Sequence, residues 1–203
     1  MSKAGIKISR REQILAALAK MLEDSPGERI TTAALAKAVG VSEAALYRHF
    51  PSKTKMFEGL IEFIEESVFT QLSLVLAQEA STVKRCELIV KTLLVFAEQN
   101  PGMSRLLSGD ALTGETQRLR QRIVQFFERI ETQLKHVLQD VDVRNHELTQ
   151  ISVASFAHFL MAYVDGVIVQ FVRSEFQSLP SLHWQTQWML LEPLLLQGEL
   201  VEA

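Results

Sequence analysis

Apolar residues recur along almost the whole chain at the three- and four-residue spacing of amphipathic helices. Ser9 and Glu12 form a capping-box pattern at the start of the first helix, which ends at the turn Asp24-Ser25-Pro26-Gly27. No segment of useful length alternates with the two-residue period of a strand. The pattern therefore predicts an all-α protein. The apolar face of the first helix is formed by Ile14, Leu15, Leu18 and Leu22.

Longer helical segments follow residue 52. Ser52 is a good N-cap for the first of them, and Ser81 or Thr82 opens the next, which reaches Asn100. Pro101, at a favoured first helical position, begins a short helix that ends near Gly109. The remaining predicted helices cover residues 115–140, 147–178 and 182–198. Together these segments predict a helical bundle.

Residues 30–55 predict two short helices joined by a tight turn. Thr31 or Thr32 caps the first helix, and Gly40 provides the left-handed residue that ends it. Ser42 caps the second helix, residues 43–49, and Pro51 prevents its continuation. This arrangement predicts a helix-turn-helix, a unit that places its second helix in the major groove of DNA.

The second helix of this unit presents small and polar side chains on its outer side. Ala44 and Ala45 permit close approach to base edges, and Tyr47 and Lys53 are placed to contact phosphates. A helical hairpin inside a bundle is the alternative, but the turn glycine, the caps and the lysines occur together and favour DNA binding. The predicted DNA-binding residues are Arg10, Arg11, Thr31, Thr32, Ser42, Glu43, Ala44, Ala45, Tyr47, Arg48, His49, Ser52, Lys53 and Lys55.

The distribution of charge supports this interpretation. The 203-residue chain has a net charge of −3, which alone would argue against nucleic acid. Residues 1–55 contain ten Lys and Arg against five Asp and Glu, whereas residues 56–203 contain eleven against nineteen. A basic N-terminal unit on an acidic body is expected when only one part of a protein meets phosphate. We therefore expect a DNA-binding domain at 1–55 and a helical dimerisation and partner or ligand domain at 56–203.

Other classes of protein have little support in the sequence. Cys86 is the single cysteine, which excludes an internal disulfide, and it lies in an apolar run as a small buried hydrophobe would. Asp165 and Pro193 interrupt the longest apolar stretches, so no membrane span is expected. No signal peptide is expected either, because the basic residues near the N-terminus are followed by an amphipathic helix and not by an apolar segment. The five histidines have no metal-ligand spacing. We expect a cytoplasmic, nucleoid-associated protein that is not an enzyme and has no cofactor or metal.

Several of these residues carry a resemblance to a known family. Thr31, Leu35, Ala36, the run Val39-Gly40-Val41-Ser42, the run Leu46-Tyr47-Arg48-His49-Phe50 and the pair Ser52-Lys53 resemble the DNA-binding domain of the TetR family. The resemblance implies an N-terminal three-helix DNA-binding domain, a C-terminal helical bundle, and a homodimer that binds palindromic double-stranded DNA.

A more specific resemblance extends beyond the helix-turn-helix. The segments RREQILAALAKMLE, NPGMSRLLSGDAL, FERIETQL and FVRSEF resemble, in the same order, a nucleoid-associated branch of the TetR family. The similarity covers residues 9 to about 178. It implies that the protein, when bound to DNA, opposes polymerisation of the division protein FtsZ and holds the C-terminal tail of FtsZ on its own C-terminal domain.

The implied tail-binding residues include three departures from the branch's pattern. Gln71 and Gln99 stand where the branch has arginine, and Val95 stands where it has glycine. Because an acidic tail is held largely through cations, Arg105 is a further candidate contact. The predicted partner-binding residues are Phe63, Gln71, Val95, Gln99 and Asn100.

A ligand-responsive repressor is the alternative function, since many TetR-like proteins have that role. His158, Tyr163 and Asp165 are candidates for a ligand pocket, although each is better explained as a satisfied core or interface polar group. The last two long helices are apolar enough to predict a four-helix interface between two subunits. The predicted dimer-interface residues are Phe156, Phe159, Leu160, Tyr163, Val167, Phe171, Leu191 and Leu195.

Overall fold

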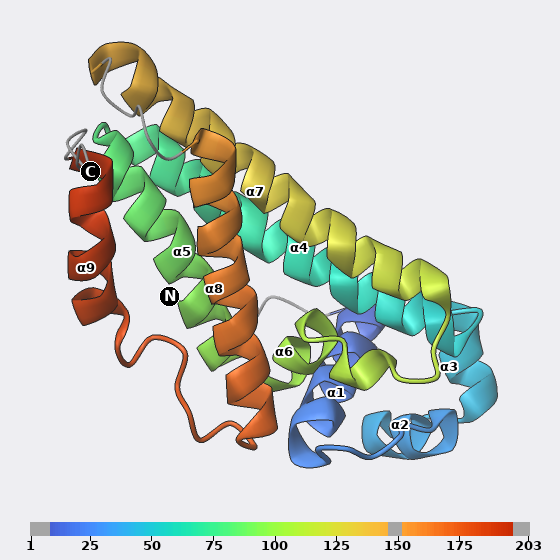
Figure 1. Ribbon diagram of the computed structural model, residues 1–203. Coiled ribbons are helices and arrows are strands. Elements are labelled where there is room, and N and C mark those ends of the chain that lie inside the picture. Colours follow the sequence, from blue (N-terminus) through green and yellow to red (C-terminus); the bar gives the residue numbers. More distant parts are fainter. Residues whose placement is uncertain (1–8, 146–151, 197–203) are drawn as a thin grey trace, which may run out of the picture.

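The computed structural model describes residues 9–145 and 152–196, and the regular elements of this part of the chain are all helices, without strands (Figure 1). The all-α prediction is confirmed. The predicted boundaries at residues 147 and 198 lie outside the described residues. The elements are α1 (Arg10–Asp24), α2 (Thr32–Val39), α3 (Glu43–His49), α4 (Lys53–Gln78), α5 (Thr82–Gln99), α6 (Pro101–Leu107), the 3-10 helix η1 (Asp110–Leu112), α7 (Gln117–Asn145), α8 (Val153–Arg173) and α9 (Trp184–Leu196).

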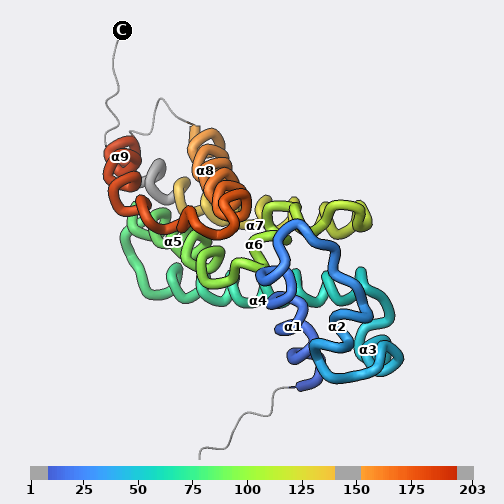
Figure 2. Tube along the Cα trace, turned by 90° about the horizontal axis from the view of Figure 1, so that it is seen from below, coloured from blue at the N-terminus to red at the C-terminus, as the bar shows by residue number. Residues whose placement is uncertain are grey.

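Helices α1, α2 and α3 form a small unit at one end of the molecule, away from α9 (Figures 1 and 2). The predicted capping box is present, because Glu12 N–H donates to Ser9 Oγ at 3.2 Å and Ser9 N–H donates to the Glu12 carboxylate at 2.6 Å. Gly40 adopts a φ of 73°, the left-handed conformation that separates α2 from α3. Leu46 of α3 and Phe50, which follows it, are buried in the core. The helix-turn-helix therefore follows from local signals.

The remaining helices form the larger body. Helices α4 and α7 lie side by side as two long rods, and α5 packs against α4, α7 and α8 (Figure 1). Cys86 is fully buried on α5, and this burial raises the pKa of its thiol to about 12. Because α4 begins at Lys53 and continues without a break through Gln78, the structure itself places no division at residue 55. The proposed domain boundary stays a prediction.

Helix α6 joins the two parts of the molecule by packing closely on α1. A Cβ atom at Gly102 would lie 1.9 Å from the carbonyl oxygen of Ala19, so only glycine permits this approach. The Arg105 guanidinium donates to the carbonyl oxygens of Leu22 at 2.9 Å and Ser25 at 2.8 Å. It also forms an ion pair with Asp110 at 2.5 Å.

These contacts correct the suggestion that Arg105 could pair with an acidic peptide. The residue is only 2% exposed, and its guanidinium is used by α1 and η1. Sequence reasoning missed this role because nothing near Arg105 in the chain identifies the end of α1 as its partner.

Helix α8 is long and apolar enough, by length and composition alone, to cross a membrane. In the structure its apolar residues Leu160, Val164 and Ile168 are buried against neighbouring helices. Its opposite side exposes the polar residues His158 and Asp165. This two-sided pattern is that of a core helix in a bundle.

Candidate DNA interface and partner groove

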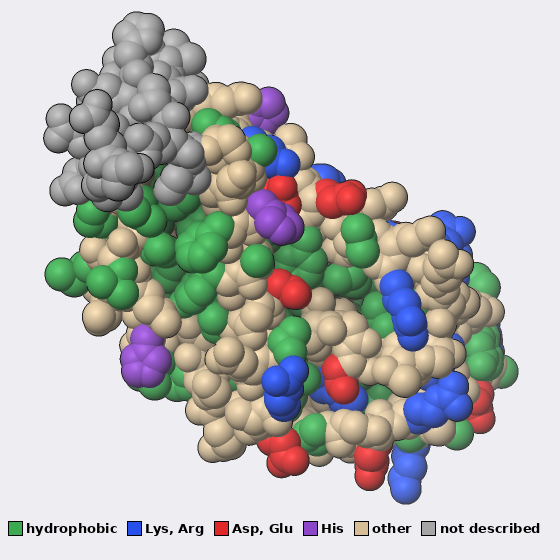
Figure 3. Space-filling model, in the orientation of Figure 1, with side chains coloured by type: hydrophobic (Ala, Val, Ile, Leu, Met, Phe, Trp, Pro, Cys, Tyr) green, Lys and Arg blue, Asp and Glu red, His purple; other side chains and the backbone are tan. Residues whose placement is uncertain are grey.

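The outer surface of α3 presents the residues that were predicted to read DNA. Ala44, Arg48 and His49 are exposed, as is the ring of Tyr47, whereas Ala45 is partly buried. Figure 3 shows Lys and Arg side chains gathered toward this end of the visible face, and apolar side chains toward the α8 and α9 end. The distribution agrees with a basic N-terminal unit.

Polar side chains connect α2 to α3. The Thr32 hydroxyl donates to the Glu43 carboxylate at 2.8 Å, and the Tyr47 hydroxyl donates to Thr32 Oγ1 at 3.4 Å. Glu43 is therefore turned toward α2, and the Tyr47 hydroxyl lies against the first turn of that helix. The predicted caps are also formed, since the hydroxyls of Thr31, Ser42 and Ser52 each accept a backbone N–H at 3.2 Å.

The cations at the edge of this unit have partners within the protein. Lys53 forms an ion pair with Glu115 at 2.7 Å, and both side chains are largely buried, at 27% and 12% exposure. Arg11 lies over the Phe50 ring at 4.5 Å and contacts Glu62 at 3.5 Å. A phosphate at either position would have to compete with a carboxylate of the protein itself. Their assignment to DNA stays a prediction.

Lys55 has a similar arrangement at the start of α4. Its ammonium group contacts Glu58 at 2.5 Å, and Arg118 of α7 contacts the same carboxylate at 3.0 Å. The hydrogen bond from Lys55, together with the nearby arginines, lowers the pKa of Glu58 despite its burial. Glu58 thus stays ionised at neutral pH and ties α7 to the N-terminal part of α4.

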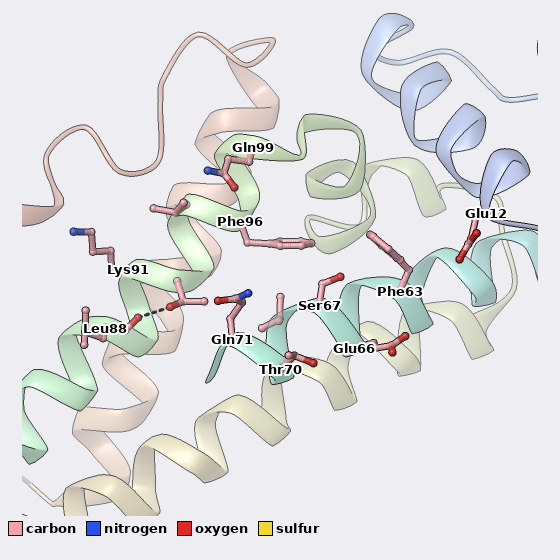
Figure 4. Close-up of a pocket in the computed structure, with 13 residues that line it drawn as sticks. Glu12, Phe63, Glu66, Ser67, Thr70, Gln71, Leu88, Lys91, Phe96 and Gln99 are labelled. Carbon is pink, nitrogen blue, oxygen red and sulfur yellow. Dashed lines mark hydrogen bonds between the residues drawn. The ribbon is translucent and has the colours of Figure 1, made fainter. Parts of the chain in front are cut away.

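A surface groove of about 820 Å³ lies between α4 and α5 (Figure 4). Four of the five predicted partner-binding residues line it: Phe63, Gln71, Val95 and Gln99. The Phe63 ring is 45% exposed, which is unusual for a large apolar side chain. Asn100 does not line the groove, because its side-chain amide donates to the Phe96 carbonyl at 2.8 Å. The structure therefore brings the predicted set together except for Asn100.

Three charged residues of the groove were not singled out from the sequence. Glu12 and Glu66 lie near Phe63, and Lys91 lies on α5 toward the other end (Figure 4). From the sequence Glu12 was identified only as a capping-box residue, and Glu66 and Lys91 look like parts of ordinary solvated helix faces. Only the pairing of α4 with α5, and of α1 with α4, shows that the three surround one concave surface.

The predicted dimer interface requires a correction. Phe156, Leu160, Phe171 and Leu195 are buried within the single chain, at 5%, 0%, 1% and 3% exposure, so they belong to the core of the protomer. The apolar excess of α8 and α9 is covered largely by the neighbouring helices of the same chain. Partial burial was found for Tyr163, Val167 and Leu191.

Exposed apolar side chains on α8 and α9 identify another surface, which includes Phe159 of the predicted set. Phe159 on α8 is 48% exposed, and Met189 and Leu190 on α9 are 63% and 72% exposed. Ala162 and Gly166, one and two turns after Phe159, are also exposed and small enough to admit a partner helix. We call Phe159, Ala162, Gly166, Met189 and Leu190 the α8–α9 face.

The three candidate ligand residues have separate surroundings. His158 lies at the surface, 3.6 Å from Glu131. The Tyr163 hydroxyl donates to Gln187 at 2.5 Å, and burial raises its pKa. Asp165 lies on the exposed side of α8, where desolvation raises the pKa of its carboxyl group. Their arrangement forms no common pocket and favours the structural explanation for each.

Comparison with known proteins agrees with this architecture. Residues 14–60 match the family of bacterial regulatory proteins, tetR family, and residues 80–196 match the tetracyclin repressor-like, C-terminal domain of the SlmA-like type. The chain is 56% identical over 192 residues to the nucleoid occlusion factor SlmA of Shewanella baltica, covering 95% of this chain and 98% of that protein. It is 60% identical over 185 residues to SlmA of a Marinomonas species, covering 91% and 94%.

Solved structures show the same fold at much lower identity. The transcriptional regulator FadR from Bacillus subtilis, in complex with stearoyl-CoA, superimposes with a TM-score of 0.76 at 14% identity, covering 93% of this chain and 98% of that one. The fatty acid degradation regulator FadR from Bacillus halodurans gives a TM-score of 0.75 at 13% identity, covering 89% and 97%. At such identities the likeness concerns the fold alone.

Proposed function

Because this chain belongs to the TetR family, and within it to the group of the nucleoid occlusion factor SlmA, we propose that it binds chromosomal DNA and inhibits assembly of the FtsZ ring over the nucleoid. The observation that carries this proposal is the continuity of α4. Lys53 lies in its first turn, beside the helix-turn-helix, and Phe63 of the same helix lines the groove. Ten residues of helix separate the two, about 15 Å.

This arrangement supports two simultaneous contacts. The recognition surface of α3 and the groove between α4 and α5 share no side chain, so DNA in one place leaves the other open. A protein held on DNA would then present its groove to the tails of nearby FtsZ molecules. In this proposal two copies associate through the α8–α9 face and place their α3 helices in successive major grooves of a palindrome, roughly 34 Å apart.

The experiment that tests the function measures FtsZ polymers. Purified protein and FtsZ are mixed with GTP, with or without a DNA site, and polymer is followed by light scattering. We expect loss of polymer that depends on the DNA. If the protein binds its DNA but leaves FtsZ polymers unchanged, the ligand-responsive repressor becomes the better explanation.

Lys53 is expected to contact phosphate and not a base. Replacing it with alanine should weaken binding to all DNA sequences alike and reduce the slope of log affinity against log salt by about 0.9. Glu115→Gln should have the opposite effect, a gain of about 2- to 5-fold, because Lys53 no longer has to leave a carboxylate. Fluorescence anisotropy over a salt series measures both.

Lys84→Ala is a matched control, since Lys84 is also paired with a glutamate, Glu87, but lies on α5. It should leave DNA affinity unchanged. The assignment would be wrong if Lys53→Ala kept the normal salt dependence and altered base preference instead.

The groove is expected to bind the FtsZ tail weakly, because Gln71 and Gln99 supply no charge. Making both residues arginine should raise affinity about 5- to 30-fold, since two partly exposed ion pairs contribute roughly 1–2 kcal/mol together. Phe63→Ala should lower it while DNA affinity stays the same. Fluorescence anisotropy with a labelled tail peptide measures the affinity of each variant. Unchanged binding in both variants would exclude this groove as the tail site.

A further inference from the structure

The groove between α4 and α5 has opposite charges at its two ends. Glu12 lies at the end near α1 and Phe63, Glu66 lies on α4 about one turn after Phe63, and Lys91 lies toward the other end on α5 (Figure 4). These are the charged residues among those that line the groove in the described part of the chain. The groove is therefore polarised along its length, although its total charge is small.

These charges are available to a ligand. The carboxylate of Glu66 and the ammonium group of Lys91 are exposed, and within residues 9–145 and 152–196 neither forms an ion pair. Glu12 accepts the backbone N–H of Ser9, a hydrogen bond that lowers the pKa of its carboxyl group and keeps it ionised at neutral pH. An occupant with complementary charges would meet carboxylates at one end and an ammonium group at the other.

Uncharged polar side chains follow Glu66 along α4 toward Lys91. Ser67 and Thr70 of α4 present hydroxyl groups, and Gln71 presents an amide that can donate or accept. Phe63 and Gln71 are eight residues apart on one helix, a rise of about 12 Å, which an extended peptide covers in about four residues. The spacing suits a short strand-like segment.

We propose that the groove imposes a direction on its peptide. A basic side chain lies against Glu12 and Glu66, an apolar side chain packs on Phe63, and a carboxylate about four residues away meets Lys91. This inference rests on the proposed function, with the FtsZ tail as the peptide. In this inference Glu66 and Lys91 select the peptide by the position of its charges. Gln71 and Gln99 cannot do so because they are uncharged.

The charge pattern distinguishes this occupant from other anionic partners. A segment with carboxylates along its whole length would place some of them against Glu12 and Glu66, where like charges repel. A nucleic acid strand would do the same with its phosphates. The groove therefore favours a peptide that carries charges of both signs in a fixed order.

Double-mutant cycles with the full-length protein test the direction. The probe is the labelled FtsZ tail peptide, in its natural form and in two versions whose basic residues or whose acidic residues are replaced by amides. We expect Glu66→Gln to weaken the natural peptide 2- to 5-fold and to have no effect on the version without basic residues. Lys91→Gln should weaken the natural peptide similarly and have no effect on the version without carboxylates.

Glu128→Gln, an exposed glutamate on α7 outside the groove, is the control and should change nothing. If Phe63→Ala weakens the peptide but neither cycle shows coupling, the tail binds in the groove without the proposed direction, and this inference is overturned. If Glu66 couples to the carboxylates of the peptide, it is overturned too. If Phe63→Ala also leaves the affinity for the peptide unchanged, the groove is not the tail site.

Discussion

Arg105→Met should destabilise the folded protein by about 3 kcal/mol, one of the largest effects expected from a single substitution in this chain. The side chain is 2% exposed and forms three contacts that join α6 to α1 and η1. Methionine preserves much of the volume but leaves the carbonyl oxygens of Leu22 and Ser25 without their donor. It also removes the cation that pairs with Asp110. Urea unfolding at neutral pH measures the loss.

A matched arginine provides the control. Arg118 pairs with Glu58 but is 69% exposed, so Arg118→Met should cost less than about 1 kcal/mol. Gly102→Ala tests the same junction by a different route, because the added Cβ would meet the Ala19 carbonyl at 1.9 Å and push α6 away from α1. An Arg105→Met protein with the urea midpoint of the natural chain would show that the junction contributes little to stability.

The junction also bears on DNA binding. Helix α1 supports the helix-turn-helix, and α6 fixes the end of α1 to the body of the protein. We expect Arg105→Met to weaken DNA binding even where the protein remains folded, because the α1 end of the DNA-binding unit loses its anchor. Lys53→Ala, by contrast, should leave the urea midpoint much closer to that of the natural chain.

The helix-turn-helix could be predicted from the sequence because its signals are local. Ser9, Thr31 and Ser42 each cap the helix that they precede, and Gly40 adopts the left-handed conformation that its position in the turn required. Such features depend on a few neighbouring residues.

The roles of Arg105 and Lys53 could not be predicted in the same way. Their partners are far away in sequence: Arg105 bonds to Leu22, and Lys53 pairs with Glu115. Composition and periodicity show that a cation is present but not which carboxylate or carbonyl oxygen meets it. The groove could not be predicted for the same reason, since Lys91 and Phe63 line one surface only when α5 folds back on α4.

The dimer interface shows a further limit. Helical periodicity identified the apolar faces of α8 and α9, but it does not distinguish a face covered by the same chain from one that awaits a second copy. Phe171 and Leu195 proved to be core residues, whereas Met189 and Leu190 are exposed. The outward stripe is less apolar in composition, because Ala162 and Gly166 contribute little surface.

Introducing charge into the α8–α9 face should therefore separate the subunits. Phe159→Glu with Leu190→Glu places two carboxylates at positions that are 48% and 72% exposed in the single chain, so the protomer can fold around them. In a dimer both would be desolvated, together with their counterparts in the second copy, and no cation is supplied in compensation. We expect a monomer whose affinity for a palindromic site falls at least about 100-fold, since one protomer no longer tethers the other to the second half-site.

Two further variants make the experiment decisive. Leu74→Glu adds a charge to α4 at a site of similar exposure, 47%, and should leave the dimer intact. Phe171→Glu with Leu195→Glu should instead prevent folding, because each carboxylate would enter the core of a single protomer. Sedimentation velocity gives the mass of each variant, and circular dichroism shows whether it is folded. If the variant Phe159→Glu with Leu190→Glu is still a folded dimer, the interface does not lie on the α8–α9 face. If this variant is unfolded, the packing of α8 and α9 within one protomer depends on these two side chains.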